Sequence, residues 1–467
     1  MDVKKNGEVS FWYADMGGVP AYRPPLPGDL AVDVCIVGGG FTGLWTAYYL
    51  KQTQPSLCVA VVEKEFAGFG ASGRNGGWCS GGFAWSREKY LETGSRAGVI
   101  DFERQLRGTV DEVIRVAEEQ GIDADIRRTD CLTYARSPAQ MQRLRESYEE
   151  EIAWEVPKSR VALIGAEEAS ARIRIENAHG AVVTHDVARV QPAKLVRGLA
   201  EAVERLGVTI YEQTTVTGIG KGCVTTDRGQ VKAPRIVRAT EGFTHGIAGN
   251  EREWVPLNSA ILVTEPVPEA VWREIGWGGY ELVADAAHAY CYAQRTAGNR
   301  IAFGGRGVPY RFGSKTDMRG QTQAETIAQL QEILWRLLPQ TRALKLDHAW
   351  CGVLGVPRDW CATVGLDCDS GIAWAGGYVG LGVSTSNLAG QTLADLVLDR
   401  QTERTGLPWV NRRPRKWERE PLRWLGIHSM YRLYHQADRN EAKGGGLKTS
   451  RLATVANWLT GRSGGGL

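Results

Sequence analysis

Long apolar runs are missing from this sequence. No stretch of ~18 apolar residues occurs, so no transmembrane helix is expected. Residues 1–18 contain no apolar run like that of a secretory signal, and we expect a cytoplasmic protein. CxxC pairs are also missing, and the nine cysteines, an odd number, are scattered along the chain. That usage indicates reduced thiols rather than a disulfide framework.

An excess of one charge sign is missing too. The net charge is only +3, which argues against a nucleic-acid-binding protein, because such proteins carry a concentrated basic surface. No His, Cys and Asp residues cluster at metal-ligand spacing, so we expect no metal site. No GxSxG occurs, so a serine hydrolase has no support. His185 and His348 are isolated, and we expect both to be structural.

Glycine, in contrast, is abundant, with 57 of 467 residues, often in short runs. Residues 38–43 read GGGFTG and contain GxGxxG directly after an apolar, strand-like run at 33–37. A helix is expected over 44–50, and a second strand over 58–62 ends at Glu63. The glycines permit a tight turn, passage of a pyrophosphate and close helix–strand packing, and the acid accepts hydrogen bonds from a ribose diol. This pattern predicts a dinucleotide site and disfavours NADP, leaving NAD and FAD.

A second glycine-rich segment separates these two cofactors. Residues 68–77, GFGASGRNGG, follow Glu63 almost at once. Small residues, a hydroxyl, an arginine and several backbone amides can contact a second part of an extended anionic cofactor. An NAD site would not need this segment, so FAD is favoured.

At this point the sequence resembles the D-amino-acid-oxidase-type family of FAD-dependent oxidoreductases, and it is most similar to the γ-glutamylputrescine oxidase-like branch, in which GASGRNGG recurs. Further matches follow in order over residues 10–400. They lie at 190–199, 208–216, 237–242, 300–306 and 376–383.

The resemblance implies a set of FAD contacts. Those in the first turn and strand end are Gly38, Gly40, Phe41, Thr42, Gly43, Glu63 and Lys64. Those in the second glycine segment are Gly70, Ala71, Ser72, Arg74, Asn75, Gly76 and Gly77. Those in later strands and the closing motif are Val216, Ala239, Thr240, Gly242, Gly377, Gly380, Leu381, Gly382 and Val383.

The resemblance also implies an α/β fold with a discontinuous Rossmann-like FAD-binding domain and an inserted α+β substrate domain with a mostly antiparallel sheet. The expected ranges are 30–95, 180–250 and 345–400 for the first, and 96–179 and 251–344 for the second. Residues 1–29 form an N-terminal arm, and 405–467 form a basic helical extension. Residues 411–434 mix large apolar side chains with arginine, so the extension either packs on its own protein or contacts a membrane surface or partner.

For such a protein we expect hydride transfer to flavin N5. The substrate is a primary or secondary amine or an amino acid, which gives an imine that hydrolyses, with O2 as acceptor forming H2O2. Burial can keep the amine neutral without a dedicated base. Candidates for the substrate cavity are Tyr290, Tyr292, Arg295 and Arg306, and an arginine there could bind a carboxylate bidentately.

Two departures from the sarcosine oxidases leave alternatives open. The region that matches their oxygen-activating lysine is 301–303 here and has no lysine. Cys351 lies about one residue from the position of covalent flavin attachment, so we expect non-covalent FAD. The alternatives are an FAD amine dehydrogenase that passes electrons to a quinone or carrier at a membrane, and a partner-binding flavoprotein without turnover.

Overall fold

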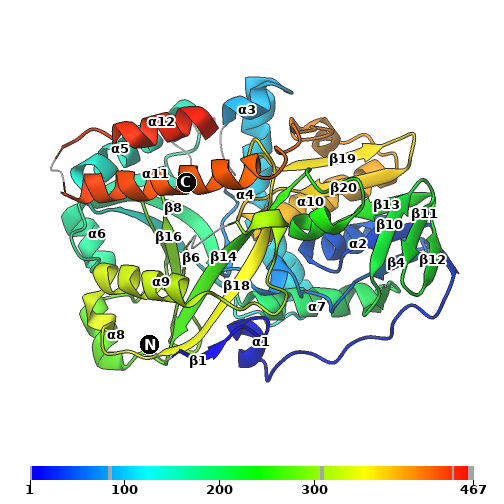
Figure 1. Cartoon of the computed structure of the whole chain (residues 1–467), viewed down its shortest axis with the longest axis horizontal. Coiled ribbons are helices and arrows are strands. Elements are labelled where there is room, and N and C mark those ends of the chain that lie inside the picture. The colour runs from blue at the N-terminus through cyan, green and yellow to red at the C-terminus, as the bar shows by residue number, and fades with distance from the viewer. Residues whose placement is uncertain (1–2, 83–86, 306–309, 444–445, 461–467) are drawn as a thin grey trace.

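A computed structural model describes residues 3–82, 87–305, 310–443 and 446–460. The strands form three sheets of six, four and ten strands. Figure 1 shows the two smaller sheets at one end of the molecule and most of the ten-stranded sheet at the other, with β14 and β18 running between them. The predicted mixed α/β class is confirmed.

The six-stranded sheet carries the glycine turn. Its order is β19 (Thr363–Asp367), β20 (Ile372–Gly376), β13 (Arg235–Arg238), β3 (Val34–Val37), β4 (Val59–Val62) and β9 (Thr209–Tyr211). All neighbours pair in parallel except β19 with β20. Strands β3 and β4 are fully buried and wholly apolar, because parallel strands are covered on both faces.

Helices cover this sheet and pack on one another. They are α2 (Phe41–Thr53), α7 (Pro192–Arg205) and α10 (Gly382–Val397), and α2 contacts both others. Trp45 of α2 is fully buried and lies against Gly390 of α10, where a side chain would collide with it. A small residue at this crossing therefore lets the two helices approach closely.

The four-stranded sheet is attached beside it. Its order is β10 (Val216–Gly220), β11 (Cys223–Thr226), β12 (Gly229–Lys232) and β2 (Leu30–Ala31). Its apolar side chains share a core with Cys35 and Val62 of the six-stranded sheet.

The ten-stranded sheet is mainly antiparallel, as expected for the second half of the fold. Its order is β1 (Val3–Asn6), β18 (Leu346–Val356), β14 (Val255–Thr264), β17 (Ile301–Gly305), β16 (Cys291–Arg295), β15 (Leu282–Asp285), β6 (Arg127–Ala135), β8 (Gly180–Arg189) and β5 (Trp78–Cys79), with β7 (Val161–Gly165) paired to β8. We predicted the ranges 30–95, 180–250 and 345–400 for the FAD-binding domain, and they contain all strands of the six-stranded sheet. However, β8 and β18, at the start of the second and third ranges, belong to the ten-stranded sheet.

The remaining helices surround the ten-stranded sheet or join the two ends. They are α1 (Phe11–Asp15), α3 (Arg87–Leu91), α4 (Arg96–Glu119), α5 (Pro138–Ala153), α6 (Ala166–Arg172), α8 (Glu269–Ile275) and α9 (Ala324–Leu337), with short 3-10 turns at Ala71–Gly73, Glu241–Gly246, Phe312–Ser314, Pro339–Thr341 and Glu403–Gly406.

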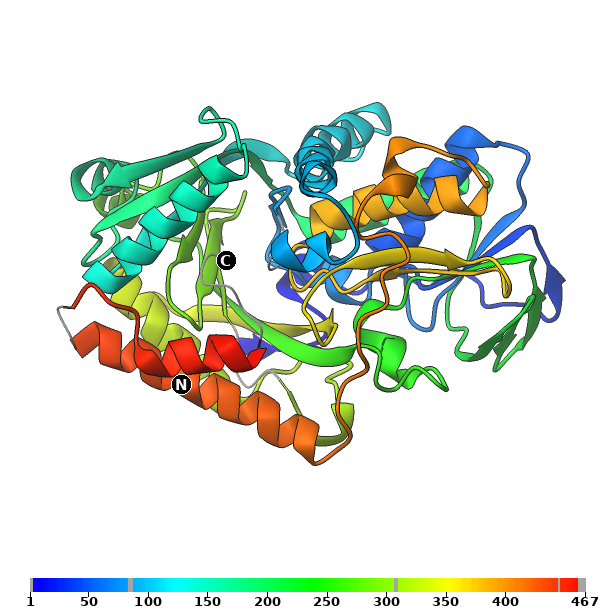
Figure 2. The same ribbon diagram turned by 90° about the horizontal axis from the view of Figure 1, so that it is seen from above.

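The expected C-terminal helices are present as α11 (Leu422–Lys443) and α12 (Arg451–Thr460). Figure 2 shows them side by side along one flank, and they contact each other. The buried residues of α11 recur at spacings of three, four and seven: Arg423, Ile427, Tyr434, Ala437 and Glu441. One face of α11 therefore packs on its own protein. No helix within the described residues is long and apolar enough to cross a membrane.

Candidate active site

A cavity of about 380 Å³ opens at the carboxyl ends of the parallel strands, where the glycine turn lies. Its wall gathers most of the predicted cofactor contacts from segments far apart in the sequence. They are Gly38, Gly40, Phe41, Thr42, Glu63, Lys64, Gly70, Ala71, Ser72, Asn75, Val216, Ala239, Thr240, Gly242, Gly380, Gly382 and Val383. The predicted Gly43, Arg74, Gly76, Gly77, Gly377 and Leu381 do not line it.

Close backbone contacts explain the glycines of the first turn. Gly38 has φ +108°, and a Cβ there would lie 2.5 Å from the carbonyl oxygen of Ala239. A Cβ at Gly43 would lie 2.1 Å from the carbonyl oxygen of Gly38. Gly43 therefore serves helix–strand packing rather than the cavity, in agreement with the job of the third glycine in such turns.

The acid at the end of β4 points to the turn. Glu63 accepts hydrogen bonds from the backbone N–H groups of Gly39 at 2.7 Å and Glu65 at 3.0 Å. Burial raises the pKa of this carboxyl above its usual value. Its position at the cavity wall suits a hydrogen-bond acceptor for a ribose diol.

The second glycine segment crosses over the first turn. The Ser72 hydroxyl accepts a hydrogen bond from the Phe41 backbone N–H at 2.8 Å, which satisfies an amide at the start of α2. Two residues of α1 hold the segment by hydrogen bonds: Trp12 donates to the Asn75 carbonyl at 2.8 Å, and Tyr13 donates to the Gly68 carbonyl at 2.9 Å. This support from the N-terminal arm was not predicted.

Arg74 is buried inside the same segment. Its guanidinium donates to the carbonyls of Phe69 at 2.7 Å and Met318 at 2.8 Å and lies 4.3 Å from the centre of the Phe69 ring. Burial lowers its pKa to about 10. Arg74 fastens the segment to the chain near Met318, and it lines a second cavity rather than the first.

A half-buried acid that the sequence did not predict also lines the first cavity. Glu241 accepts hydrogen bonds from the backbone N–H groups of Gly377 at 3.0 Å, Tyr378 at 3.2 Å and Gly355. Burial raises its pKa to about 7. Gly377 lines neither cavity, but its N–H donates to this carboxylate, which lines the first cavity. In the sequence, this acid lies in Ala-Thr-Glu-Gly directly after β13. That pattern alone indicates the end of a strand and does not indicate a functional acid.

The closing glycine motif leads into α10. Gly380 has φ +104°, and Gly382 begins the helix. Tyr378, just before them, shares a hydrogen bond of 2.8 Å with the Thr42 hydroxyl at the start of α2. The N-termini of α2 and α10 therefore meet at one cavity, and each offers backbone amides to an anion.

A second cavity of about 290 Å³ adjoins the first. The two have wall residues in common: Ala71, Asn75, Leu354, Gly380 and Val383. The predicted Arg74, Gly76 and Leu381 line this second cavity. Its outer wall comes from β16, β14, α4 and α5.

Two of the four residues predicted for the substrate cavity lie here. Tyr290 and Tyr292 both line it. The Tyr292 hydroxyl shares a hydrogen bond of 3.1 Å with Ser259. Its ring covers Gly76 and Gly304, where a Cβ would lie 2.7 Å and 2.3 Å from ring carbons. The glycines thus make room for this tyrosine.

Arg295, a third residue predicted for this cavity, is not brought to its wall. Arg295 is buried away from both cavities, donates to the Trp277 carbonyl at 2.7 Å and to Asn299, and lies 4.1 Å from the centre of the Trp272 ring. These contacts occupy the guanidinium group inside the core of the same domain. We assigned Arg295 to the substrate cavity, but its position indicates a structural role. Arg306 lies outside the described residues.

Charged side chains of α3, α4 and α5 line the far side of the second cavity, and no sequence pattern predicted them. Arg87 is 2.6 Å from Glu103 and 2.7 Å from Glu151. The second carboxylate oxygen of Glu103 is buried and has no hydrogen-bond partner within the described residues. Arg107 lies 3.9 Å from it. The cavity thus offers an acceptor and a cation to a polar ligand.

The isolated histidines and Cys351 have defined partners. His348 donates to the Gly7 carbonyl at 2.8 Å and is buried, which lowers its pKa. His185 pairs with Asp130 at 2.9 Å and lines the second cavity. All nine cysteines are free, and Cys351 lines neither cavity.

A sequence model described as "FAD dependent oxidoreductase" matches residues 33–396. The chain belongs to this family. FAD is therefore the cofactor, and the first cavity fits it: Gly38 and Gly40 bring backbone without a side chain to its wall, and the N-termini of α2 and α10 lie at the site.

Named relatives agree with this assignment. The γ-glutamylputrescine oxidoreductase of Escherichia coli is 28% identical over 399 residues, which cover 83% of this chain and 89% of that protein. The sarcosine oxidase subunit beta of Rhodobacter capsulatus is 24% identical, covering 73% and 79%. The crystal structure of glycine oxidase from Geobacillus kaustophilus has a TM-score of 0.66 at 22% identity, covering 80% of this chain and 96% of that one, and shows that the fold is shared.

Proposed function

We propose that this FAD-dependent oxidoreductase oxidises a primary or secondary amine or an amino acid. One observation carries the proposal: a cavity with tyrosines and charged groups shares a wall with the FAD cavity at Gly380 and Val383, where α10 begins. The E. coli relative is named for an amine substrate, and the structural relative for an amino acid. A ligand in the second cavity would therefore lie next to the site of electron transfer.

The residues that would hold FAD are those named above for the first cavity, with Glu63 toward a ribose and the α2 N-terminus toward the pyrophosphate. When bound, FAD accepts a hydride at N5. The α10 N-terminal amides stabilise negative charge that develops beside them. Because Cys351 does not reach the cavity, we propose that the cofactor is held without a covalent bond.

The second cavity prepares the substrate. Tyr290 and Tyr292 form part of its wall and would shield one side of a bound ligand from water. Exclusion of water favours the neutral amine, since burial disfavours charge, and only the neutral amine releases hydride readily. Oxidation then gives an imine, and water adds to the imine to release the amine nitrogen and leave a carbonyl product.

The electron acceptor separates oxidase from dehydrogenase. We propose O2 as the acceptor, with H2O2 as the product. One feature argues against O2: the region that matches the oxygen-activating lysine of the sarcosine oxidases has no lysine. It consists of Ile301, Ala302 and Phe303, which are all buried in β17. A dehydrogenase that passes electrons to a quinone or carrier is therefore the second candidate. Contact with a membrane through 411–434 has less support, because α11 buries one face on its own protein.

Anaerobic bleaching of the bound flavin tests the proposal. The purified holoenzyme is mixed with polyamines, amino acids, N-methylated amines and aminophosphonates, and air is then admitted. Rapid bleaching by one amine with quick recovery and stoichiometric H2O2 supports an amine oxidase. Bleaching without recovery in air points to the dehydrogenase. If none of the compounds bleaches the flavin, the amine proposal fails and a partner-binding flavoprotein without turnover gains weight.

A further inference from the structure

The loop that carries Tyr290 is held from outside by the C-terminal helices. Residues 286–290 connect β15 to β16, and Tyr290 at their end lines the second cavity. Asp438 of α11 accepts hydrogen bonds from the backbone N–H groups of His288 at 2.8 Å and Ala289 at 3.0 Å. One carboxylate therefore fixes two consecutive amides directly before the tyrosine.

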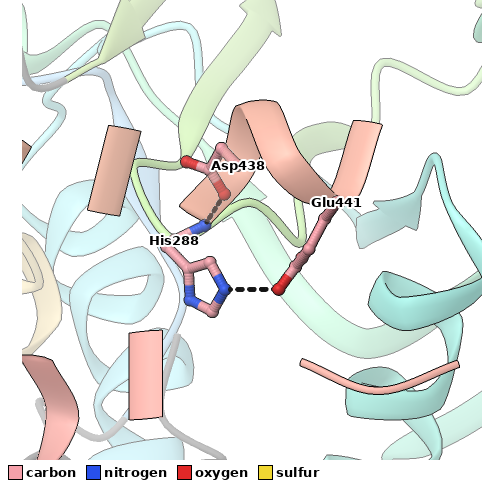
Figure 3. Close-up of side chains that lie close together, drawn as sticks. All are labelled: His288, Asp438 and Glu441. Atoms are coloured by element: carbon pink, nitrogen blue, oxygen red, sulfur yellow. Dashed lines mark hydrogen bonds and ion pairs between the residues drawn. The ribbon is translucent and has the colours of Figure 1, made fainter. Parts of the chain in front are cut away.

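A second carboxylate one helical turn further holds the side chain of the same loop. Glu441 contacts His288 Nε2 at 3.0 Å, and Figure 3 shows both acids converging on this histidine from one helix. Glu441 also accepts from Arg143 Nη1 at 2.7 Å and from the Ser450 backbone N–H at 2.8 Å. Burial opposes its charge, but these three donors outweigh burial and hold the pKa of Glu441 at about 2.

Arg143 closes the network from α5. Its Nη2 donates to the Ala286 carbonyl at 2.7 Å, while its Nη1 donates to Glu441. The loop is thus bonded at Ala286, His288 and Ala289 to α11 or to its partner on α5. The Ala286 N–H also donates to the Tyr134 carbonyl of β6 at 2.8 Å. His288 also stacks on Tyr434 of α11, with ring centres 6.0 Å apart.

His288, Asp438 and Glu441 have the composition of a metal site, but their ligand atoms are already used. Both oxygens of Asp438 accept backbone N–H groups, and both oxygens of Glu441 accept hydrogen bonds, one from an arginine. A guanidinium at 2.7 Å would oppose a cation at the same carboxylate. The arrangement acts as a clamp on the loop rather than as a metal centre.

We propose that Asp438 and Glu441 are positioning residues that hold Tyr290 in place in the substrate cavity. Through these two residues, α11 would contribute to the shape of this cavity. Both acids lie beyond residue 396, where the family match ends. The proposal rests on the proposed function in that it takes the second cavity as the substrate site.

The test uses full-length holoenzyme with Asp438→Ala, and Arg439→Ala as the matched control on an exposed site of the same turn. Hydrogen exchange, followed by mass spectrometry, needs no substrate. Asp438→Ala is expected to speed exchange at residues 286–291 by at least about 10-fold, because two amides lose their acceptor, while residues 38–43 and the flavin content stay unchanged. Unchanged exchange at 286–291 overturns the clamp, whether or not an amine substrate is known.

Turnover then tests the link to Tyr290. With an amine that bleaches the flavin, Asp438→Ala is expected to lower kcat/KM by about 10-fold, and by less than about twofold in a Tyr290→Ala background, because coupled residues are not additive. A lower melting temperature with unchanged kcat and KM, or a full 10-fold loss in both backgrounds, overturns the positioning role. Should Asp438→Ala fail to fold, Glu441→Gln replaces it in both measurements. Stabilisation of the wild type by Zn²⁺ that Glu441→Gln abolishes would overturn the clamp in favour of a metal site.

Discussion

The two cavities are built in different ways. The first has Gly38, Gly40, Gly70 and Gly242 in its wall, together with small residues from several segments of the chain. The second is walled by tyrosines and by ionised side chains on α3, α4 and α5. A dinucleotide approaches the backbone so closely that only certain residues fit, whereas a substrate is recognised by side chains that many residues could supply. The cofactor cavity is therefore the one with a strong sequence signature.

Gly43→Val is the variant with the largest expected effect, and it tests whether the glycine turn of the first cavity tolerates a side chain. A Cβ at this position would lie 2.1 Å from the Gly38 carbonyl oxygen and 3.0 Å from Ile36, so the start of α2 must shift. We expect a loss of about 4 kcal/mol or more in stability, with loss of bound flavin. Flavin absorbance per protein and thermal unfolding measure both effects.

Gly108→Ala is the matched control. Gly108 is an exposed residue of α4, and a Cβ at this position would have no atom within 4 Å among the described residues. The variant should gain about 0.4–1 kcal/mol, because alanine restricts the unfolded chain. Full flavin content in Gly43→Val would show that the first cavity tolerates a side chain at the turn.

Arg87→Met tests the second cavity. Arg87 is only 7% exposed and pairs with Glu103 and Glu151, so its removal takes from the buried Glu103 its nearest cation. We expect a loss of about 3–5 kcal/mol in the free energy of unfolding, measured by urea titration, while the folded fraction keeps its flavin.

An exposed ion pair provides the comparison for Arg87. Arg415 is 73% exposed and lies 2.6 Å from Glu418, so Arg415→Ala should cost less than about 1 kcal/mol. Equal losses in the two variants would contradict a buried ionic wall at the second cavity.

Glu241 gives the first cavity a dependence on pH. Its folded pKa of about 7 lies above the ordinary 4.5, so the folded state binds the proton more tightly than the unfolded state. The contribution of this group to stability is full below pH 4.5 and is lost as the pH rises through 7, by at most about 3 kcal/mol. Urea titrations of the flavin-free protein between pH 4.5 and 8 measure this slope.

Glu241→Gln should flatten that slope, because glutamine keeps one acceptor oxygen and does not titrate. Glu118→Gln, on an exposed site of α4, should leave the slope as it is. A wild-type slope that survives in Glu241→Gln would assign the pH dependence to another group.

The smallest expected effect belongs to Tyr292→Phe. The ring stays over Gly76 and Gly304, but the hydroxyl that meets Ser259 at 3.1 Å is lost. We expect about a 10-fold fall in kcat/KM with the amine found by bleaching, equivalent to ~1.4 kcal/mol, and unchanged flavin content. Tyr22→Phe removes an exposed hydroxyl and should change neither quantity.

Several features could be predicted from the sequence because their residue types have few alternatives. GxGxxG between two apolar strands, followed by Glu63, defines the turn, and the turn is found at the first cavity with Gly38 and Gly40 in its wall. The C-terminal helices could be predicted from their apolar spacing. The Arg295 assignment failed because a position in a strand next to tyrosines does not say which face the side chain takes.

By itself the sequence determined the glycine turn of the first cavity, since close backbone contacts restrict Gly38 and Gly43 to glycine. The charged wall of the second cavity was decided only by the tertiary structure. Arg87 and Glu103 reach the cavity of Tyr292 because α3 packs on α4, and α4 packs on α10 and β8. In the first cavity, Glu241 likewise gains its partners from two distant segments. Contacts of this kind depend on how elements pack in space, and the spacing of residues along the chain carries no record of that packing.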